Sequence, residues 1–355
     1  MSAHYKNRPF AAFAAVAAIS LLAAAGCGDL GPHDDQAAPG ASPTATTSST
    51  PSPTASPSKP GPRTQPASLP ATIQPLSGLP GTARKPVLAV KIDNVAAARP
   101  QTGLSKADLI YIEPVEAGLA RGMAVFSSRL PSTVGPIRSA RESDLELLRQ
   151  FGTPAFAYSG ANSKVLPLIA KAPVTDLSPA HAGSPYFRGT AKPAPHNLYA
   201  RPADLLARAP KASKAHDIGF RFGAAPAGGR ADTSETVRYS AFKVGFTWSA
   251  SAGRWSVAMD GKPFGAADGT PARPSTVVVQ YVDISPSRFG DKWGNKSPYT
   301  KSVGSGRALV LRDGRSYDAR WSRPSATSGT SFTTAAGQPM TFAPGQVWVV
   351  FAPRS

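Results

Sequence analysis

A single cysteine, Cys27, stands at the end of an uncharged apolar run that extends from Phe10 to Gly26. The run follows Lys6 and Arg8, is too short for a comfortable membrane span, and has the size of the apolar core of a signal peptide. Three small residues directly before the cysteine are typical of a lipoprotein processing site, where the thiol receives a diacylglyceryl group. We therefore predict that residues 1–26 are a lipoprotein signal peptide, and that the folded part has no disulfide and is held together by core burial.

This prediction sets the compartment. Lipidated Cys27 would hold the protein in the membrane, at its extracellular face. The alternative is a plain secretory signal in which Cys27 is incidental.

The charge of the chain restricts its partners. The net charge is +18, and residues 71–212 carry 17 basic and 9 acidic side chains against 18 and 9 in residues 213–355. Since the excess is spread over both halves, it is not a basic tail. Outside the cell, nucleic acid is not an expected partner, and anionic lipid head groups, an anionic wall polymer or peptidoglycan are the natural counter-charges. The alternative is a compositional bias with no function attached.

Residues 27–70 are predicted to be a disordered tether. Residues 31–70 contain 10 prolines and 13 serines or threonines, and Leu69 is their only large apolar side chain. Such a segment cannot bury enough surface to offset its ordering entropy. Proline-rich chain would reach on the order of 100 Å.

Residues 71–212 are predicted to form an α/β domain. Buried-strand patterns occupy 86–93, 107–114, 120–128 and 154–160. Helical patterns occupy 142–151, 162–171 and 201–209. Strands and helices that alternate in this way indicate a mixed sheet domain.

The character of the sequence changes after a linker predicted at 213–235. Residues 236–355 hold all five tryptophans, in β-branched and aromatic runs separated by Asp-Gly, Pro-Gly and Gly-Ser-Gly turns. We predict a mostly-β domain, and thus an α+β protein overall. These aromatic residues could stack on sugar rings, although their strand-like spacing favours core positions.

The stretch 135–151, GPIRSARESDLELLRQF, predicts a helix start. Ser139 and Glu142 match a capping box, with Ser139 as the N-cap. No activating base or Gly-x-Ser-x-Gly elbow accompanies Ser139, so a nucleophile is not expected. Arg138 and Arg141 flank the helix start, where they could form a carboxylate or phosphate site or could pair with nearby acids.

Charged side chains also collect at predicted strand ends. Lys91 and Asp93 end the first strand, and Glu113 and Glu116 follow the second. Strand ends that converge in an α/β domain are common places for sites. Paired carboxylates could do acid/base work or bind a hard cation, and salt bridges to Arg99 and Arg121 are the simpler interpretation.

His196 lies in the loop sequence APHNLYA. It could be a general base or a ligand, and a hydrogen-bonded structural role is the alternative. No second His or Cys sits at zinc spacing, so neither a metal site nor a cofactor is predicted.

Several stretches, in this order, resemble the YerB-like lipoprotein family. They are PLSGLP, AVKIDN, ARPQTGLSKADLIYIEPVEAGLAR, GPIRSAR and APHNLYA, followed by VVVQYVD, GSGRALVLRDGR and PGQVWVVFAP. The resemblance implies tandem N- and C-terminal domains of unknown function in a secreted, membrane-anchored protein of the bacterial envelope. It implies no activity.

Three functions remain open. The first is a non-enzymatic binding or scaffold protein whose basic cleft holds an anionic envelope ligand; its residues would be Lys91, Asp93, Arg99, Glu113, Glu116, Arg121, Arg138, Arg141 and His196. The second is an envelope hydrolase that uses Glu113 or Glu116 with His196, which requires hydrogen-bond contact between them. The third is a protein–protein adaptor, which would expose an apolar patch on the β domain.

Overall fold

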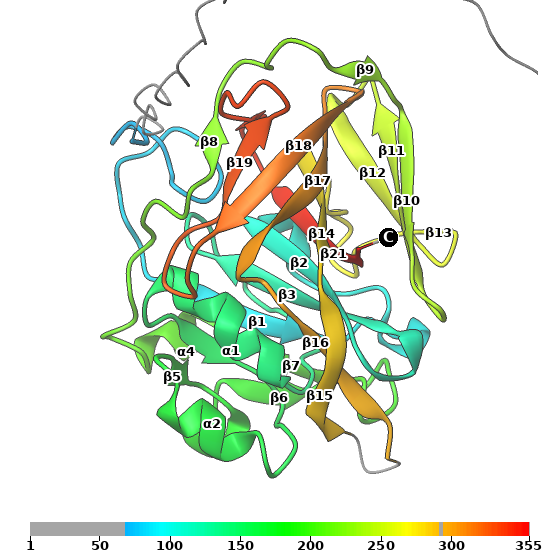
Figure 1. Cartoon of the computed structure of the whole chain (residues 1–355). Helices are drawn as coiled ribbons and strands as arrows, with labels where there is room; N and C mark the ends of the chain where they lie inside the picture. Colours follow the sequence, from blue (N-terminus) through cyan, green and yellow to red (C-terminus); the bar gives the residue numbers. More distant parts are fainter. Residues whose placement is uncertain (1–67, 291–293, 355) are drawn as a thin grey trace, which may run out of the picture. The chain divides into compact units, whose positions relative to one another are not determined.

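Strands from the two halves of the chain pair in one large mixed sheet (Figure 1). The computed structural model describes residues 68–290 and 294–354. The predicted signal peptide, Cys27 and nearly all of the predicted tether lie outside the described residues.

The first half mixes short helices with strands. Its strands are β1 (Leu88–Ile92), β2 (Leu109–Pro114), β3 (Ala120–Phe126), β4 (Ala155–Ala157), β5 (Thr175–Asp176), β6 (Tyr186–Arg188) and β7 (Leu198–Ala200). Its helices are α1 (Glu142–Leu148), α2 (Leu166–Lys171), α3 (Pro179–Ala182) and α4 (Pro202–Ala207), with 3-10 turns η1 (Ala96–Ala98), η2 (Leu104–Lys106), η3 (Glu116–Gly118) and η4 (Arg149–Phe151).

The second half contains only strands among its described residues. They are β8 (Arg221–Phe222), β9 (Arg230–Ala231), β10 (Ser234–Arg238), β11 (Lys243–Ser249), β12 (Arg254–Met259), β13 (Lys262–Pro263), β14 (Thr276–Val282), β15 (Ile284–Gly290), β16 (Lys296–Thr300), β17 (Gly304–Arg312), β18 (Arg315–Arg323), β19 (Ser331–Thr334), β20 (Thr341–Phe342) and β21 (Val347–Pro353). The α/β segment followed by a mostly-β segment confirms the fold class expected from the sequence.

The large sheet has the strand order β19-β18-β17-β14-β21-β2-β3-β1-β4-β5, with β9 paired to β18. The junction between the halves is the parallel pair of β2 and β21, in which Ile110 lies opposite Trp348. The central strands β1 and β2 are buried along their whole length, as expected for a sheet that is covered on both faces.

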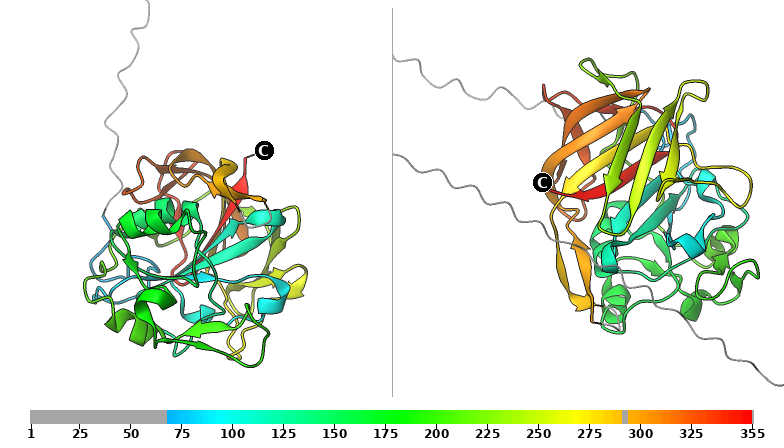
Figure 2. Two further views of the ribbon diagram at one scale, coloured as in Figure 1. Left: turned by 90° about the horizontal axis from the view of Figure 1, so that it is seen from below. Right: turned by 90° about the vertical axis from the view of Figure 1, so that its right-hand side faces the viewer.

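Each face of the sheet has its own core. On one face the four-stranded sheet β10–β13 packs against the large sheet, and Phe246 meets Trp348 edge to face (Figure 2, right). On the other face α1 contributes Leu147 and Leu148 to a core that contains Met123. We call these the β-covered face and the helix-covered face.

Two helices differ in detail from their predicted patterns. The pattern predicted at 162–171 becomes helical only in its second half, with Pro167 in the first turn of α2, where the N–H that proline lacks would have no partner within the helix. Helix α4 covers the centre of its predicted range.

Over the described ranges, no helix has the length and apolar content needed to cross a bilayer.

Candidate functional site

Polar side chains gather where β1 and β2 end and β3 begins. Both β1 and β2 pair antiparallel with β3, so their carboxyl ends lie beside the start of β3, at one end of these central strands. Within β2 and β3, Glu113 lies directly opposite Arg121. Helix α1 lies across this edge on the helix-covered face (Figure 1).

Lys91 lies at the centre of a buried charge triad. Its Nζ contacts Glu113 and is 2.6 Å from Asp144 Oδ1, and all three side chains are at most 3 % exposed. Burial raises the pKa of Glu113 to about 8, against the opposing effect of Lys91. Burial alone would lower the pKa of Lys91, but Asp144 and Glu113 leave it raised. The triad is therefore most stable with Lys91 charged and one proton on Glu113, and none of it is open to a ligand.

The N-cap of α1 lies two residues later than the sequence predicts. The N-cap is Arg141, and its backbone N–H donates to Asp144 Oδ2 at 2.7 Å. The prediction that Ser139 caps the helix with Glu142 was wrong. Asp144 takes the capping role because its other oxygen is already fixed by Lys91.

Glu116 pairs with Arg141 in a bidentate contact. Arg141 Nε and Nη2 donate to the two carboxylate oxygens at 2.6 and 2.7 Å, and the Ser297 hydroxyl from β16 donates to the same carboxylate. Burial opposes ionisation, yet the hydrogen bonds and charge of Arg141 lower the pKa of Glu116 to about 2. This geometry is the strong form of an arginine–carboxylate pair.

Asp93 is fully buried and contacts both His196 and Arg138. Its Oδ2 accepts from His196 Nδ1 at 2.8 Å and lies 3.3 Å from Arg138 Nε. The bond fixes the proton of His196 on Nδ1 and turns the other ring nitrogen away from Asp93. Arg138 and His196 are 25 % and 20 % exposed, so the outer parts of both side chains reach solvent.

Arg121 lies between these two pairs. Its Nη1 donates to the Ser139 carbonyl at 3.2 Å, and among the described residues no carboxylate is within ion-pair distance of it. Burial, together with the positive charge of Arg141, lowers the pKa of Arg121 to about 10, and Arg138 acts in the same direction. We call Arg121, Arg138 and Arg141 the arginine cluster.

A pocket of about 560 Å³ opens beside the cluster. Arg141 is the member of the cluster that lines it, beside Glu142 and with the polar side chains of Ser139, Asn162, Ser163 and Ser297 and the ring of Phe289. Most of these groups can donate or accept hydrogen bonds, and Phe289 supplies an aromatic surface. We call it the cluster pocket.

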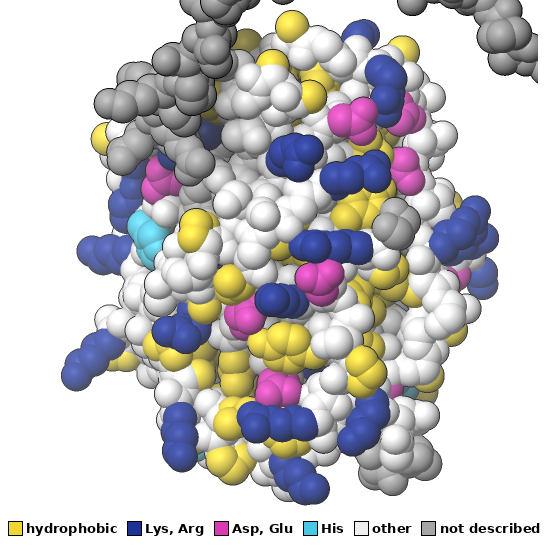
Figure 3. Space-filling view, viewed as in Figure 1, with side chains coloured by type: hydrophobic (Ala, Val, Ile, Leu, Met, Phe, Trp, Pro, Cys, Tyr) yellow, Lys and Arg dark blue, Asp and Glu magenta, His cyan; other side chains and the backbone are white. Residues whose placement is uncertain are grey.

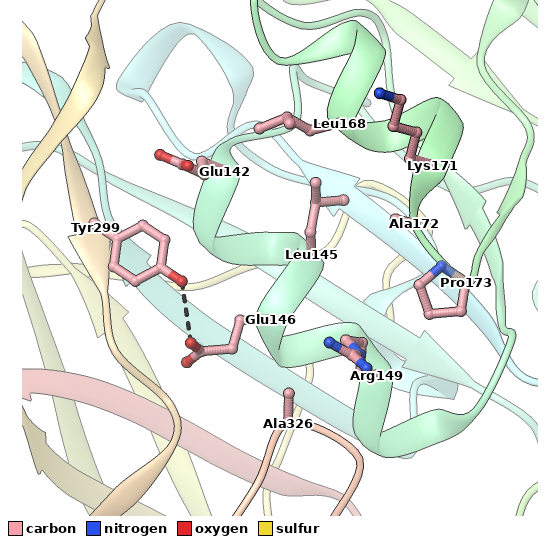
Figure 4. A pocket seen from close by; sticks show the side chains of 10 residues that line it. All are labelled: Glu142, Leu145, Glu146, Arg149, Leu168, Lys171, Ala172, Pro173, Tyr299 and Ala326. Atoms are coloured by element: carbon pink, nitrogen blue, oxygen red, sulfur yellow. Dashed lines mark hydrogen bonds between the residues drawn. The ribbon is translucent and has the colours of Figure 1, made fainter.

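The strands β15 and β16 form an arm that reaches from the second half of the chain onto α1 (Figure 1). Ser287 donates to Glu142 at 2.6 Å, and Tyr299 donates to Glu146 at 3.0 Å. A second pocket, of about 460 Å³, lies over the outer side of α1, where Leu145 projects toward Leu168 of α2 (Figure 4). Its walls contain no member of the arginine cluster.

Arg99 stands apart from the other predicted residues. Its guanidinium donates to the Asn94 carbonyl at 2.6 and 3.0 Å and pairs with Asp260 at 2.8 Å, in the turn after β12. Neither Glu113 nor Glu116 hydrogen-bonds to His196, because each carboxylate is held by its own cation. In the part of the chain that the structure describes, no three His, Asp or Glu side chains are placed to hold a metal ion.

Two contributors could not be identified from the sequence. Asp144 looks like an ordinary acid in the first turn of a helix. Ser297 lies 181 residues from Glu116, in a strand with no marked composition. In both cases the contact partner depends on how the sheet and the arm are placed, and no local pattern reports it.

Comparison with known proteins places this arrangement in a family. The family model described as "Protein of unknown function (DUF3048) N-terminal domain" matches residues 76–216, and the corresponding C-terminal domain model matches residues 235–349. "Putative lipoprotein YerB" of Bacillus subtilis is 39 % identical over 132 residues, which are 35 % of this chain and 39 % of that protein. This match thus spans well under half of the relative's length.

A solved structure has the same fold. The crystal structure of the YerB protein from Bacillus subtilis superposes with a TM-score of 0.67 at 22 % identity, over 79 % of this chain and 97 % of that one. The two domain models cover most of the described residues, in the order expected from the resemblance. The chain belongs to the DUF3048 family, and carries both its N-terminal and its C-terminal domain.

Proposed function

We propose that this protein is a lipid-anchored binding protein at the extracellular face of the membrane, and that its arginine cluster holds an anionic group of a cell-envelope polymer. The observation that carries the proposal is Arg121, a largely buried guanidinium without a carboxylate partner among the described residues. Two further arginines, Arg138 and Arg141, lie close enough to lower its pKa, and the carboxylates near it, Asp93 and Glu116, pair with those two arginines.

The charges of the site support an anionic ligand. The cluster contributes three positive charges, and Glu116 and Asp93 contribute two negative ones. Asp93 is moreover shared with His196. An anion beside Arg121 and Arg138 would restore the balance in a region where water screens charge poorly.

The cluster pocket suggests how such a ligand is held. Guanidinium groups bind phosphate and carboxylate oxygens through paired hydrogen bonds. Ser139, Asn162 and Ser163 in the pocket wall are suited to sugar or polyol hydroxyls next to the anion. We expect Lys91, Glu113 and Asp144 to support the site from below without contacting the ligand.

The membrane anchor rests on Cys27 and on the name of the relative. Cys27 follows a signal-like apolar run, and the Bacillus subtilis relative is named as a lipoprotein. Mass spectrometry of the protein purified from membranes would detect diacylglyceryl on Cys27. A free thiol there would contradict the anchor without touching the proposal for the arginine cluster.

Binding is tested with the full chain in detergent, mixed with purified cell-wall material either intact or stripped of its anionic polymer. We expect Arg138→Gln to weaken retention on intact wall about tenfold, the usual cost of one lost charge-assisted hydrogen bond. Arg129→Gln is the matched control, since Arg129 is exposed beyond the other end of β3. Equal retention of both variants, or equal retention on stripped wall, would contradict the proposal.

The geometry favours neither alternative. A hydrolase based on Glu113 or Glu116 with His196 would need contacts that the structure replaces with ion pairs. For an adaptor, the described part of the β segment exposes no large hydrophobic side chain, and Leu166 of α2 is the one such residue in the described ranges, at 44 %.

A further inference from the structure

The β-covered face of the large sheet carries a second group of arginines, far in sequence from the first. Alternation along β14, β17, β18 and β21 places Tyr281, Arg307, Arg320 and Arg354 on this face, because Val279, Leu311 and Ala352 of the same strands belong to its core. Lys91 and Arg121 lie on the helix-covered face, because Ala89 and Met123, two residues away along the same strands, belong to the core of that face. The two groups of arginines therefore lie on opposite faces of the sheet.

Arg307 and Arg320 are direct cross-strand neighbours. They are paired in the register of β17 and β18. Like charges in this position repel one another and weaken a strand pair. Over the described residues, neither guanidinium has an ion pair or a hydrogen bond; Arg307 instead lies over the ring of Tyr281, at 5.6 Å from its centre.

Arg354 approaches the same place from the end of β21. Its Nη2 donates to the Ser305 carbonyl at 2.6 Å, and its Nε lies 3.2 Å from Asp283. Glu235 and Asp318 also lie near Tyr281, and Asp318 pairs with Arg230 at 3.0 Å. None of these three acids forms an ion pair with Arg307 or Arg320.

A small pocket lies between these side chains. Its volume is about 220 Å³, and it is lined by Tyr281, Gly306, Arg307, Arg320 and Arg354. A Cβ at position 306 would lie within 3 Å of the Trp321 indole, which belongs to the core of the opposite face, so the packing beneath the strand requires glycine here. Lys and Arg side chains are visible over β17 and β18 on the surface (Figure 3).

We propose that Tyr281, Arg307, Arg320 and Arg354 form a second, independent anion site that takes a phosphate group. Three guanidinium groups that approach from three strands suit the several oxygens of a tetrahedral phosphate better than the two oxygens of a carboxylate. The small volume fits the phosphate itself, with the rest of the ligand outside. The source is either a free phosphate or the phosphate diester of a lipid head group or polymer.

The site is tested by calorimetric titration of the full chain in detergent with inorganic phosphate, with glycerophosphoglycerol as the soluble diester, and with acetate. We expect binding of at least one phosphate compound and tighter binding than of acetate. Replacing both arginines in Arg307→Gln/Arg320→Gln should weaken it at least tenfold. The matched control is Arg273→Gln, which should bind as the parent does. Arg273 is exposed and precedes the start of β14, whereas Tyr281 lies near the end of that strand.

The titrations separate this site from the arginine cluster and identify the source. A phosphate response that is lost in Arg307→Gln/Arg320→Gln belongs to the second site, whereas a response that only Arg138→Gln weakens belongs to the arginine cluster. The compound that binds shows whether free phosphate or a phosphate diester is preferred. No response to either compound, or a response that Arg307→Gln/Arg320→Gln retains, would overturn the proposal.

A second measurement does not depend on the ligand. In phosphate-free buffer, Arg320→Gln should raise the melting temperature, because it removes the repulsion between directly opposed charges. Phosphate should then stabilise the parent chain more than the variant. A lower melting temperature for Arg320→Gln would show that Arg320 serves the fold, and would count against a site built for a ligand.

Discussion

At the scale of single residues, the buried proton on Glu113 makes stability depend on pH. Glu113 has a pKa of about 8 in the folded protein and about 4.5 as the ordinary value, so the folded state binds its proton more tightly. This contribution is complete below pH 4.5 and is lost as the pH rises toward 8. We therefore expect the free energy of unfolding to fall across this window, measured by urea denaturation at a series of pH values.

Replacing Glu113 by glutamine isolates this effect. Glu113→Gln keeps a neutral hydrogen-bonding side chain beside Lys91 and should flatten the slope between pH 4.5 and 8. A weaker slope should remain, because burial also raises the pKa of Asp108. Glu235→Gln in β10, outside the triad, should keep the full slope; a Glu113→Gln variant with the parent slope would show that Glu113 does not hold the proton.

At the scale of elements, the arm formed by β15 and β16 is held to α1 and η3 by hydroxyl–carboxylate bonds. Ser287, Ser297 and Tyr299 each donate to a different glutamate. A hydrogen bond to a charged group contributes about 1.5–3 kcal/mol. The triple variant Ser287→Ala/Ser297→Ala/Tyr299→Phe should therefore speed amide hydrogen exchange in the arm by more than tenfold, while exchange at the β2–β21 pair stays unchanged.

Ser285→Ala provides the control for the arm, because Ser285 lies opposite Tyr299 but has no hydrogen bond from its side chain among the described residues. Equal exchange in the triple variant and in Ser285→Ala would mean that backbone pairing alone holds the arm in place. Loss of protection at β2 as well would mean that the arm is part of the global core.

Local patterns were a good guide to elements and a poor guide to their ends and contacts. The apolar runs at 86–93 and 107–114 contain β1 and β2, because a fully buried strand must be apolar along its length. The N-cap of α1 was placed wrongly at Ser139, because the local pattern does not show that Lys91 fixes Asp144 in position to cap Arg141. The salt bridges expected from Glu113 and Glu116 to Arg99 and Arg121 were wrong, since Lys91 and Arg141 hold these carboxylates instead; the contribution of Ser297 was not foreseen at all.

At the scale of the whole molecule, the change in sequence character near residue 213 predicts two domains, while the large sheet continues through both segments. The strand β21, near the end of the chain, lies between β14 of its own half and β2 of the other half. Gln346 also donates to the carbonyls of Leu104 and Ala107 at 2.8 and 2.9 Å. Separating the halves would expose β2 and β21, which are buried except at Pro353, so we expect the halves to unfold together.

The distribution of chromophores allows this to be measured. All five tryptophans lie after residue 235, and all four described α-helices lie before residue 208. Tryptophan fluorescence therefore reports on the second half, and circular dichroism at helix wavelengths reports mainly on the first. In urea the two signals should change with the same midpoint, and Trp348→Ala, which removes a fully buried ring at the junction, should lower both midpoints by the equivalent of about 3–5 kcal/mol. The opposite result would be two separate midpoints, of which Trp348→Ala lowers only the one measured by fluorescence. The two halves would then be domains that are each stable alone, although their strands pair in one sheet.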